Sequence, residues 1–124
     1  MKFKVTWSKA MRFEEEYFDL NAQGVYLIGY RDTATNKRYP VYVGQGDVGA
    51  RLADHHRNNE CIKKRVNQSG RVGYYRYAKA ENEDDRLDVE LGLYQNHGGP
   101  KLCNEVEPPG SGRHENVEIE ESFK

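Results

Sequence analysis

Short apolar blocks alternate with polar ones along the chain, and their spacings predict both strands and helices. Residues 2–7 alternate polar and apolar side chains, which is the period of a short strand. Two blocks rich in Val, Ile and Tyr, 24–30 and 39–43, flank a polar, turn-forming segment at 32–38, so we predict a β-hairpin. Residues 71–79 have the composition of a third strand.

Three further stretches favour helices, each with a recognisable start or stop. Asp47 is a good N-cap for a helix that runs to about Arg57. A second, shorter helix fits residues 60–67. The third covers residues 83–96, because acidic side chains at its start suit the helix dipole and a Gly-Gly-Pro sequence stops it. The mixture predicts an α/β fold of the α+β kind.

The two ends of the chain are less regular than its middle. Residues 11–20 fit either a helix or an irregular stretch, and both remain open. The last fifteen residues resemble an exposed tail or an edge segment, and we expect a solvated end. We therefore divide the chain into an N-terminal extension (1–21), a main domain (22–106) and an acidic C-terminal tail (107–124).

Size and composition fit one globular domain. At 124 residues with 36% hydrophobic residues, the chain can bury a core. No apolar run approaches the roughly 18 to 20 residues of a membrane span, and the N-terminus lacks a signal-peptide core. The only cysteines, Cys61 and Cys103, lack the density of a disulfide framework, so we expect a reduced, cytoplasmic setting. Zinc binding by these two with His97 and His114 is an alternative that no C-x-x-C pair supports.

The net charge of −1 conceals an uneven distribution. Residues 51–80 carry eight basic and two acidic side chains, whereas residues 81–124 carry four basic and twelve acidic ones. Tyrosines interleave with the basic residues, which suits contact with phosphates and stacking on bases. A solvated face beside a strand explains the same pattern, and charge alone does not separate the two. The basic residues concerned are Arg57, Lys63, Lys64, Arg65, Arg71, Arg76 and Lys79.

One carboxylate breaks the pattern of the third predicted helix. At about 100° per residue, its apolar side chains cover one broad arc, and Glu90 falls inside that arc between Leu93 and Tyr94. Every other acidic residue of the helix lies outside it. A carboxylate aimed at the core must be paired, hydrogen-bonded or bound to a cation. An ion pair with Arg51, or a side chain that bends out to solvent, would be the structural explanations.

Two polar residues border the inward face of the helix after Asp47. Val48 and Leu52 form that face, and Arg51 and His55 lie beside it, four residues apart and so on one side. Arg offers a planar fork for phosphate oxygens, and His moves protons near neutral pH. A surface Arg with a packing His is the structural alternative.

The hairpin supplies two tyrosines that can converge. Tyr26 lies on one strand and Tyr42 on the other, and Gly24 and Gly44 leave space beside them for close approach of backbone or ligand. Tyrosines are ordinary strand residues, so a structural role explains either one alone.

Together these residues resemble the GIY-YIG nuclease family over about residues 22 to 106. Gly24-Val25-Tyr26 matches the first motif and Tyr42-Val43-Gly44 the second. Arg51 with His55 reproduces the R-x-x-x-H of the family's first helix, Glu90 matches its lone carboxylate, and Pro100 to Asn104 resembles its closing motif. The resemblance implies a small three-stranded antiparallel sheet flanked by helices.

The resemblance also implies phosphodiester hydrolysis with a single Mg²⁺ or Mn²⁺. Carried over by position, Glu90 binds the metal, Arg51 contacts the phosphate, and Tyr26 with His55 activates the attacking water. Tyr42 positions water or phosphate, and Asn104 braces the site. One carboxylate suits a cation that keeps most of its waters.

The implied partner is nucleic acid, DNA in preference to RNA. Gln45 follows the second motif, where excision-repair members of the family place a lysine, and we group it with the basic residues as a substrate contact. No second DNA-binding domain follows, so we expect specificity to come from a protein partner or from self-association, or to be low. The alternative function is a non-catalytic nucleic-acid- or protein-binding module on a GIY-YIG fold.

Overall fold

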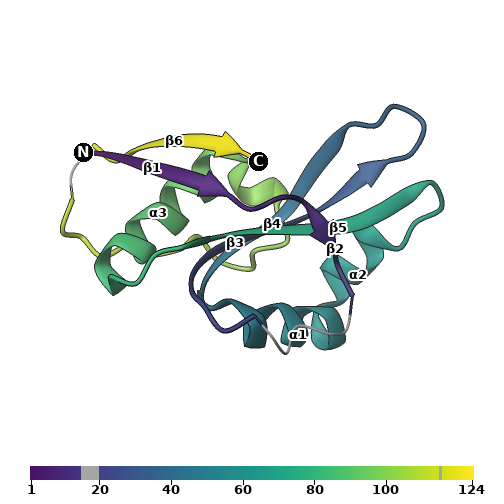
Figure 1. The fold of residues 1–124 in the computed structure, drawn as a ribbon, viewed down its shortest axis with the longest axis horizontal. Helices are drawn as coiled ribbons and strands as arrows, with labels where there is room; N and C mark the ends of the chain where they lie inside the picture. Colours follow the sequence, from purple (N-terminus) through teal and green to yellow (C-terminus); the bar gives the residue numbers. More distant parts are fainter. Residues whose placement is uncertain (15–19, 115) are drawn as a thin grey trace.

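The computed structural model describes residues 1–14, 20–114 and 116–124. Within these residues the chain forms six strands in two sheets and three α-helices, with one 3₁₀ turn (Figure 1). The elements, in order, are β1 (Lys2–Trp7), β2 (Met11–Arg12), β3 (Gln23–Asp32), β4 (Arg38–Asp47), α1 (Val48–Asn58), α2 (Glu60–Val66), β5 (Arg71–Lys79), α3 (Glu83–Asn96), η1 (Gly99–Lys101) and β6 (Glu118–Phe123).

The main sheet has the order β2-β5-β3-β4, with every neighbouring pair antiparallel. The predicted hairpin and third strand are confirmed, because β3 lies between β4 and β5 and pairs with both. The two-residue β2 extends this sheet and comes from the stretch that was left open between helix and irregular structure. Residues 15–19 of that stretch lie outside the described residues.

Each predicted helix is confirmed, and each begins at a side-chain cap. Asp47 accepts a hydrogen bond from the Ala50 backbone N–H, and Asn59 and Asn82 cap α2 and α3 in the same way. These caps satisfy N–H groups that have no partner inside a helix. The caps therefore fix where α1, α2 and α3 start, and with them the positions of His55 and Glu90.

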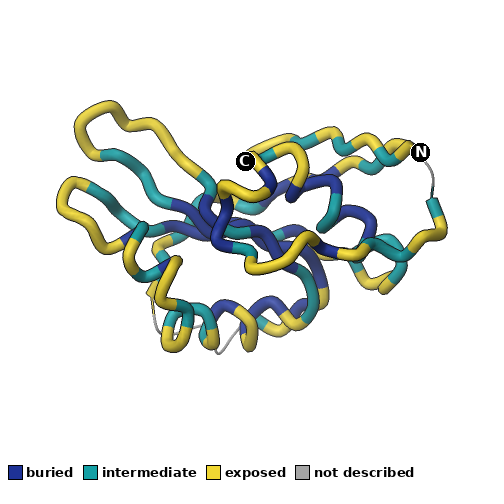
Figure 2. The backbone as a smooth tube through the Cα atoms, turned by 180° about the vertical axis from the view of Figure 1, so that it is seen from behind, coloured by how far each residue is buried: buried dark blue, intermediate teal, exposed yellow. Residues whose placement is uncertain are grey.

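Side chains of the main sheet divide between two cores because strand residues alternate in direction. Val25 and Leu27 of β3 pack with α3 on one face, whereas Tyr26 and Ile28 pack with α1 and α2 on the other. Figure 1 shows α1 on one side of the sheet and α3 with β1 and β6 on the other. Figure 2 shows burial concentrated along the central strands and exposure at the turn between β3 and β4.

The C-terminal residues form a strand in a two-stranded sheet, which agrees with the edge-segment alternative and corrects the expectation of a solvated end. β6 pairs in parallel with β1, from Lys2 opposite Glu118 to Trp7 opposite Phe123, and the two lie side by side in Figure 1. Trp7 is fully buried, and its indole N–H donates to the Glu121 carboxylate at 2.9 Å. Short-range patterns could not show this pairing, because more than 110 residues separate the two strands.

The covering of α3 by β6 also corrects the helical arc drawn from the sequence. Asp88, which the helical wheel places outside the apolar arc, is buried, and so is Gly92. A Cβ at position 92 would lie 2.5 Å from Ile119 Cγ1, so glycine here permits close approach of β6. The helix is buried on a face whose partner lies at the far end of the chain.

The two cysteines form a disulfide, contrary to the expectation of reduced thiols. Cys61 of α2 is bonded to Cys103, which follows η1, across a sequence separation of 42. Both cysteines are thereby used, so they do not supply the thiolates that zinc binding with His97 and His114 would need. His97 is the C-cap of α3, and its ring contacts Glu121 at 2.8 Å. None of the described helices has the length and apolar character needed to cross a membrane.

Candidate functional site

A cavity of about 640 Å³ opens beside β4, the edge strand of the main sheet. Its walls come from β4, α1, α2, α3 and the segment after η1. Four residues proposed from the sequence line it, namely Tyr42, His55, Glu90 and Asn104. Side chains from five separate segments thus meet at one concave surface, as ligand sites commonly do.

Tyr26 of β3 does not line this cavity, but it is hydrogen-bonded to His55 of α1, which does. The Tyr26 hydroxyl lies 2.8 Å from His55 Nε2, and Tyr26 is 1% exposed. Gly44 sits opposite Tyr26 in the register of β4, and a Cβ there would lie 2.3 Å from the phenol oxygen. Glycine in the second motif therefore makes room for the tyrosine of the first. The Tyr42 ring stacks at 6.1 Å from that of Tyr26 and 4.2 Å from that of His55.

Burial controls the protonation of these three side chains. It raises the pKa of Tyr26 well above 10 and also raises the pKa of Tyr42, because a phenolate loses hydration inside the protein. The negative charge of Glu90 acts in the same direction on both. Burial lowers the pKa of His55 to about 4, so its imidazole is neutral at pH 7.

Glu90 faces the cavity without a partner for its carboxylate. Among the described residues, none donates a hydrogen bond to it or lies within ion-pair distance of 4.0 Å. Burial raises its pKa to about 7, and the positive charge of Arg51 opposes that rise. The ion pair with Arg51 considered from the sequence is therefore not formed. A half-buried carboxylate in this state is a strong candidate for a cation ligand.

Arg51 is exposed beside the cavity, and its charge reaches every titrating member of the site. It lowers the pKa values of Tyr26, Tyr42, His55 and Glu90. Its side chain lies over Gly46, where a Cβ would come within 3.4 Å of the guanidinium Nε. In the part of the chain that the structure describes, the guanidinium has no hydrogen-bond or ion-pair partner, so it can receive an anion.

Asn104 ties the segment after η1 to β4. Its side-chain N–H donates to the Val43 carbonyl at 2.8 Å, and its side-chain oxygen accepts from the Val43 N–H at 3.2 Å. The amide thus pairs with both polar groups of an edge-strand residue, as another strand would. This contact fixes β4 at Val43, the residue next to Tyr42.

The basic residues proposed as substrate contacts fall into two groups. Arg57 and Lys64 are exposed on α1 and α2, and Lys63 lies between them with its ammonium near the Arg57 carbonyl and Glu60. Arg65 and Arg71 instead donate to the carbonyls of Lys101 and Arg65.

Two further proposed contacts are held inside the structure. Arg76 is 7% exposed and donates to the carbonyls of Ser8 and Lys124, so it has little surface to offer a phosphate. Gln45 accepts a hydrogen bond from Arg86 at 3.2 Å.

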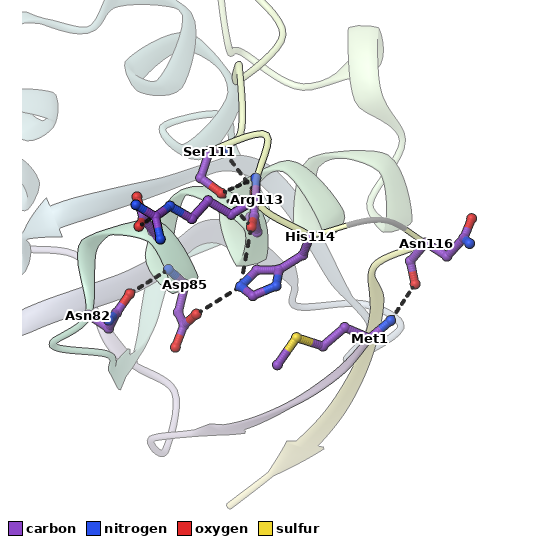
Figure 3. Close-up of polar contacts among 9 residues, drawn as sticks. Met1, Asn82, Asp85, Ser111, Arg113, His114 and Asn116 are labelled. Carbon is purple, nitrogen blue, oxygen red and sulfur yellow. Dashed lines mark hydrogen bonds and ion pairs between the residues drawn. The ribbon is translucent and has the colours of Figure 1, made fainter.

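A second polar cluster, which sequence reasoning did not identify, joins α3 to residues 111–114 (Figure 3). Asp88 is 4% exposed and accepts hydrogen bonds from the Ser111 N–H and hydroxyl, each at 2.7 Å. His114 lies 3.2 Å from Asp85 and 3.8 Å from Asp88. These contacts fasten residues 111–114 to α3, and the acidic start of the helix was the only signal of them.

The polar side chains at the cavity can be compared with the ligands that a divalent cation needs. No described group of three or more His, Cys, Asp and Glu side chains could enclose a metal ion. Glu90 offers an unpartnered carboxylate with the Tyr42 hydroxyl in the same cavity, and Asp54, Glu60 and Glu105 also line it. This set does not fit a structural metal, but it fits Mg²⁺ or Mn²⁺ held by one carboxylate, water and substrate oxygens. Comparisons of the chain with protein-family models, with curated proteins and with solved structures find no match.

Proposed function

We propose that this chain is a divalent-metal-dependent endonuclease with a GIY-YIG-like fold that hydrolyses phosphodiester bonds of DNA. The observation that carries the proposal is one cavity lined by Tyr42, His55 and the unpartnered Glu90 carboxylate, with the buried Tyr26 hydroxyl 2.8 Å from His55 Nε2. Arg51 supplies the permanent positive charge beside them. This combination meets the needs of phosphodiester hydrolysis, namely an anion-binding group, a proton acceptor and a cation ligand.

In hydrolysis, a water oxygen bonds to phosphorus while the bond from phosphorus to one ester oxygen breaks. Arg51 binds a non-bridging oxygen and stabilises the charge that develops on it. Tyr26 first gives its hydroxyl proton to solvent, and its phenolate oxygen then orients the water and receives the water's proton while the leaving ester oxygen takes up a proton from solvent. Tyr42 positions the water or the phosphate. Glu90 would hold the cation, which when bound would supply Lewis-acid charge stabilisation and offset the carboxylate charge that adds to the effect of burial on both phenol pKa values.

The surface of α1 and α2 provides the contacts to a nucleic-acid backbone in this proposal. Arg57, Lys63 and Lys64 lie on these two helices, and the carbonyl contact of Lys63 leaves its charge available. Such contacts set affinity and its salt dependence, and they carry no sequence information by themselves. Gln45 reaches substrate only by releasing Arg86.

A non-catalytic binding module on the same fold remains the second candidate, and one observation favours it. Asp54, Glu60 and Glu105 line the cavity, and their charges repel a polyanion unless a cation offsets them. Binding of nucleic acid without divalent ions, and without cleavage when they are added, would support this alternative.

A supercoiled-plasmid nicking assay with and without Mg²⁺ or Mn²⁺ tests the proposal. We expect metal-dependent nicking that falls about 100-fold or more in Glu90→Gln and in Arg51→Ala, by analogy with the loss of one oxyanion-stabilising group. Tyr26→Phe, which removes only the hydroxyl, should lose activity as well. Glu83→Gln makes the same chemical change at an exposed position of α3, and Arg113→Ala removes an exposed arginine distant in sequence from the site. Cleavage by Glu90→Gln at the wild-type rate would contradict the proposal.

A further inference from the structure

The side chain of Asn59 lies between the start of α2 and the ring of His55. As N-cap of α2, its oxygen accepts a hydrogen bond from the Ile62 N–H at 3.1 Å. A backbone N–H can only donate, so the oxygen end of the amide must face Ile62. The amide nitrogen therefore points the other way, and it lies 3.3 Å from His55 Nδ1.

This orientation decides which ring nitrogen of His55 carries the proton. An amide NH₂ has no acceptor, so the nitrogen that it faces must accept. The ring is neutral at pH 7, because burial lowers the pKa of His55 to about 4, and a neutral imidazole has one donor and one acceptor nitrogen. With Nδ1 as acceptor, the proton lies on Nε2. The neighbouring Asp54 is a hydrogen-bond acceptor for Asn58, one turn further along α1, at 2.8 Å.

The Nε2 atom of His55 lies 2.8 Å from the Tyr26 hydroxyl, so the tautomer fixes the direction of that hydrogen bond. We propose that Asn59 is a positioning residue that sets the Nε2–H tautomer of His55, which then donates to the Tyr26 oxygen. His55 in this arrangement cannot take the proton of Tyr26. It instead supports negative charge on the phenol oxygen, and the hydroxyl proton of Tyr26 points elsewhere.

The catalytic consequence rests on the proposed nuclease function, whereas the tautomer does not. If Tyr26 receives a proton from water, its oxygen must first be free of its own proton, and a donor at Nε2 stabilises that state. With the opposite tautomer, Tyr26 would donate to Nε2 and its deprotonated oxygen would lose the hydrogen bond. Asn59 would then govern how well Tyr26 activates water without touching substrate.

The variant Asn59→Asp replaces the hydrogen-bond donor that faces His55 Nδ1 by an acceptor while keeping the shape of the side chain. Asp is as good an N-cap as Asn, so one carboxylate oxygen still accepts from Ile62. The second oxygen replaces the NH₂ group and can only accept, so His55 Nδ1 must become protonated. Asn82→Asp makes the same exchange at the N-cap of α3, where the side chain accepts from the Asp85 N–H and His55 is not involved.

Long-range ¹H–¹⁵N correlation spectra of the ¹⁵N-histidine-labelled full chain, without divalent ions, show which imidazole nitrogens are protonated. We expect His55 to carry its proton on Nε2 in the wild type and in Asn82→Asp, and to be protonated at Nδ1 in Asn59→Asp. A wild-type ring protonated on Nδ1 alone would overturn the inference. So would a folded Asn59→Asp variant with the wild-type pattern. If Asn59→Asp does not fold, the wild-type spectrum alone decides.

Plasmid nicking with Mg²⁺ separates the failure of this inference from that of the proposed function. We expect Asn59→Asp to cleave about 10-fold or more slowly than both the wild type and Asn82→Asp, as changes to outer partners of a site commonly do. An inactive wild type with the expected spectra would support the tautomer and reject the nuclease. An active Asn59→Asp variant with a reversed tautomer would overturn the positioning role.

Discussion

At the scale of single residues, the protein keeps a carboxyl group in a place where its charge is costly. Glu90 lies in the cavity with its pKa raised to about 7, because burial penalises the charge more than Arg51 favours it. A structural glutamate would gain by pairing, and this one has no partner among the described residues. Uptake of a proton relieves that cost, and a cation bound in the cavity would do so as well.

The cost of Glu90 predicts how stability depends on pH in the absence of divalent ions. Its pKa rises from about 4.5 in the unfolded chain to about 7 in the folded one, so the folded state binds the proton more tightly. Stability contributed by this group is present below pH 4.5 and is lost as pH rises to 7. Glu90→Gln should therefore gain about 1 to 2 kcal/mol relative to wild type between pH 4 and pH 8, after allowance for solvent screening.

Urea unfolding at several pH values, with a chelator present, measures this difference. Glu83→Gln on the exposed start of α3 is the matched control and should show no such trend. A constant difference between Glu90→Gln and wild type across the range would mean that Glu90 is not desolvated in solution.

The charge of Arg51 gives a second residue-scale prediction. Arg51 lowers the pKa values of both Glu90 and His55, one an acid and the other a base. Arg51→Met, which keeps much of the side-chain length without the charge, should raise both values. NMR titration of the Glu90 carboxyl carbon and the His55 ring reports them separately. Arg57→Met on the same helix is the control, and shifts of opposite sign would show that rearrangement, rather than lost charge, was measured.

What the sequence revealed about the site follows from the range of each interaction. Glu90 was identifiable because helical periodicity places it on the apolar arc, and the periodicity is local. Asn59 could be recognised as a helix cap, but its contact with His55 depends on how α1 and α2 meet. Arg76 was grouped with phosphate-binding residues because of its neighbours in sequence, whereas its partners are at Ser8 and Lys124.

At the scale of elements, local signals placed the hairpin and helices well. Caps at Asp47, Asn59 and Asn82 and the apolar alternation of β3, β4 and β5 act within a few residues. The pairing of β6 with β1 could not be read in this way, because a charged, half-exposed strand resembles a tail until its partner is known. The disulfide was missed because two cysteines are too few to indicate a disulfide framework, and only the fold brings Cys61 and Cys103 to a Cα–Cα distance of 5.7 Å.

The disulfide links α2 to the segment that holds Asn104, so its removal should loosen two supports of the site together. Closing a loop with a sequence separation of 42 residues should contribute about 2 to 4 kcal/mol. We expect the free energy of unfolding to be lower by that amount in the reduced protein and in the double variant Cys61→Ser/Cys103→Ser. Urea denaturation measures this difference. The double variant itself should be insensitive to reductant. Labelling of both cysteines by a thiol reagent in the native, unreduced protein would contradict the bond.

At the scale of the whole molecule, the two ends of the chain close over α3 and so help to hold Glu90 in place. Arg76 of β5 donates to carbonyls near both ends, at Ser8 and Lys124, and its guanidinium lies 4.9 Å from the Phe123 ring centre. His97 at the end of α3 contacts Glu121 of β6. The helix that carries Glu90 is thus fixed on one side by the main sheet and on the other by the paired termini.

Gly92 provides a test of this closure, because the sign of the change in unfolding free energy in Gly92→Ala decides it. In an exposed helix, replacing glycine by alanine stabilises by about 1 kcal/mol, because glycine has more conformational freedom to lose. Here a Cβ would lie 2.5 Å from Ile119 Cγ1 and 3.0 Å from its Cδ1, so overpacking should outweigh that gain. We expect Gly92→Ala to destabilise the full chain by about 1 to 3 kcal/mol.

Ile119→Ala removes both clashing atoms, and in that background Gly92→Ala should become neutral or stabilising. Urea unfolding of the four proteins gives the coupling energy directly. A stabilising Gly92→Ala in the otherwise wild-type chain would show that β6 does not pack on α3, and would leave Glu90 on a helix that the termini do not support.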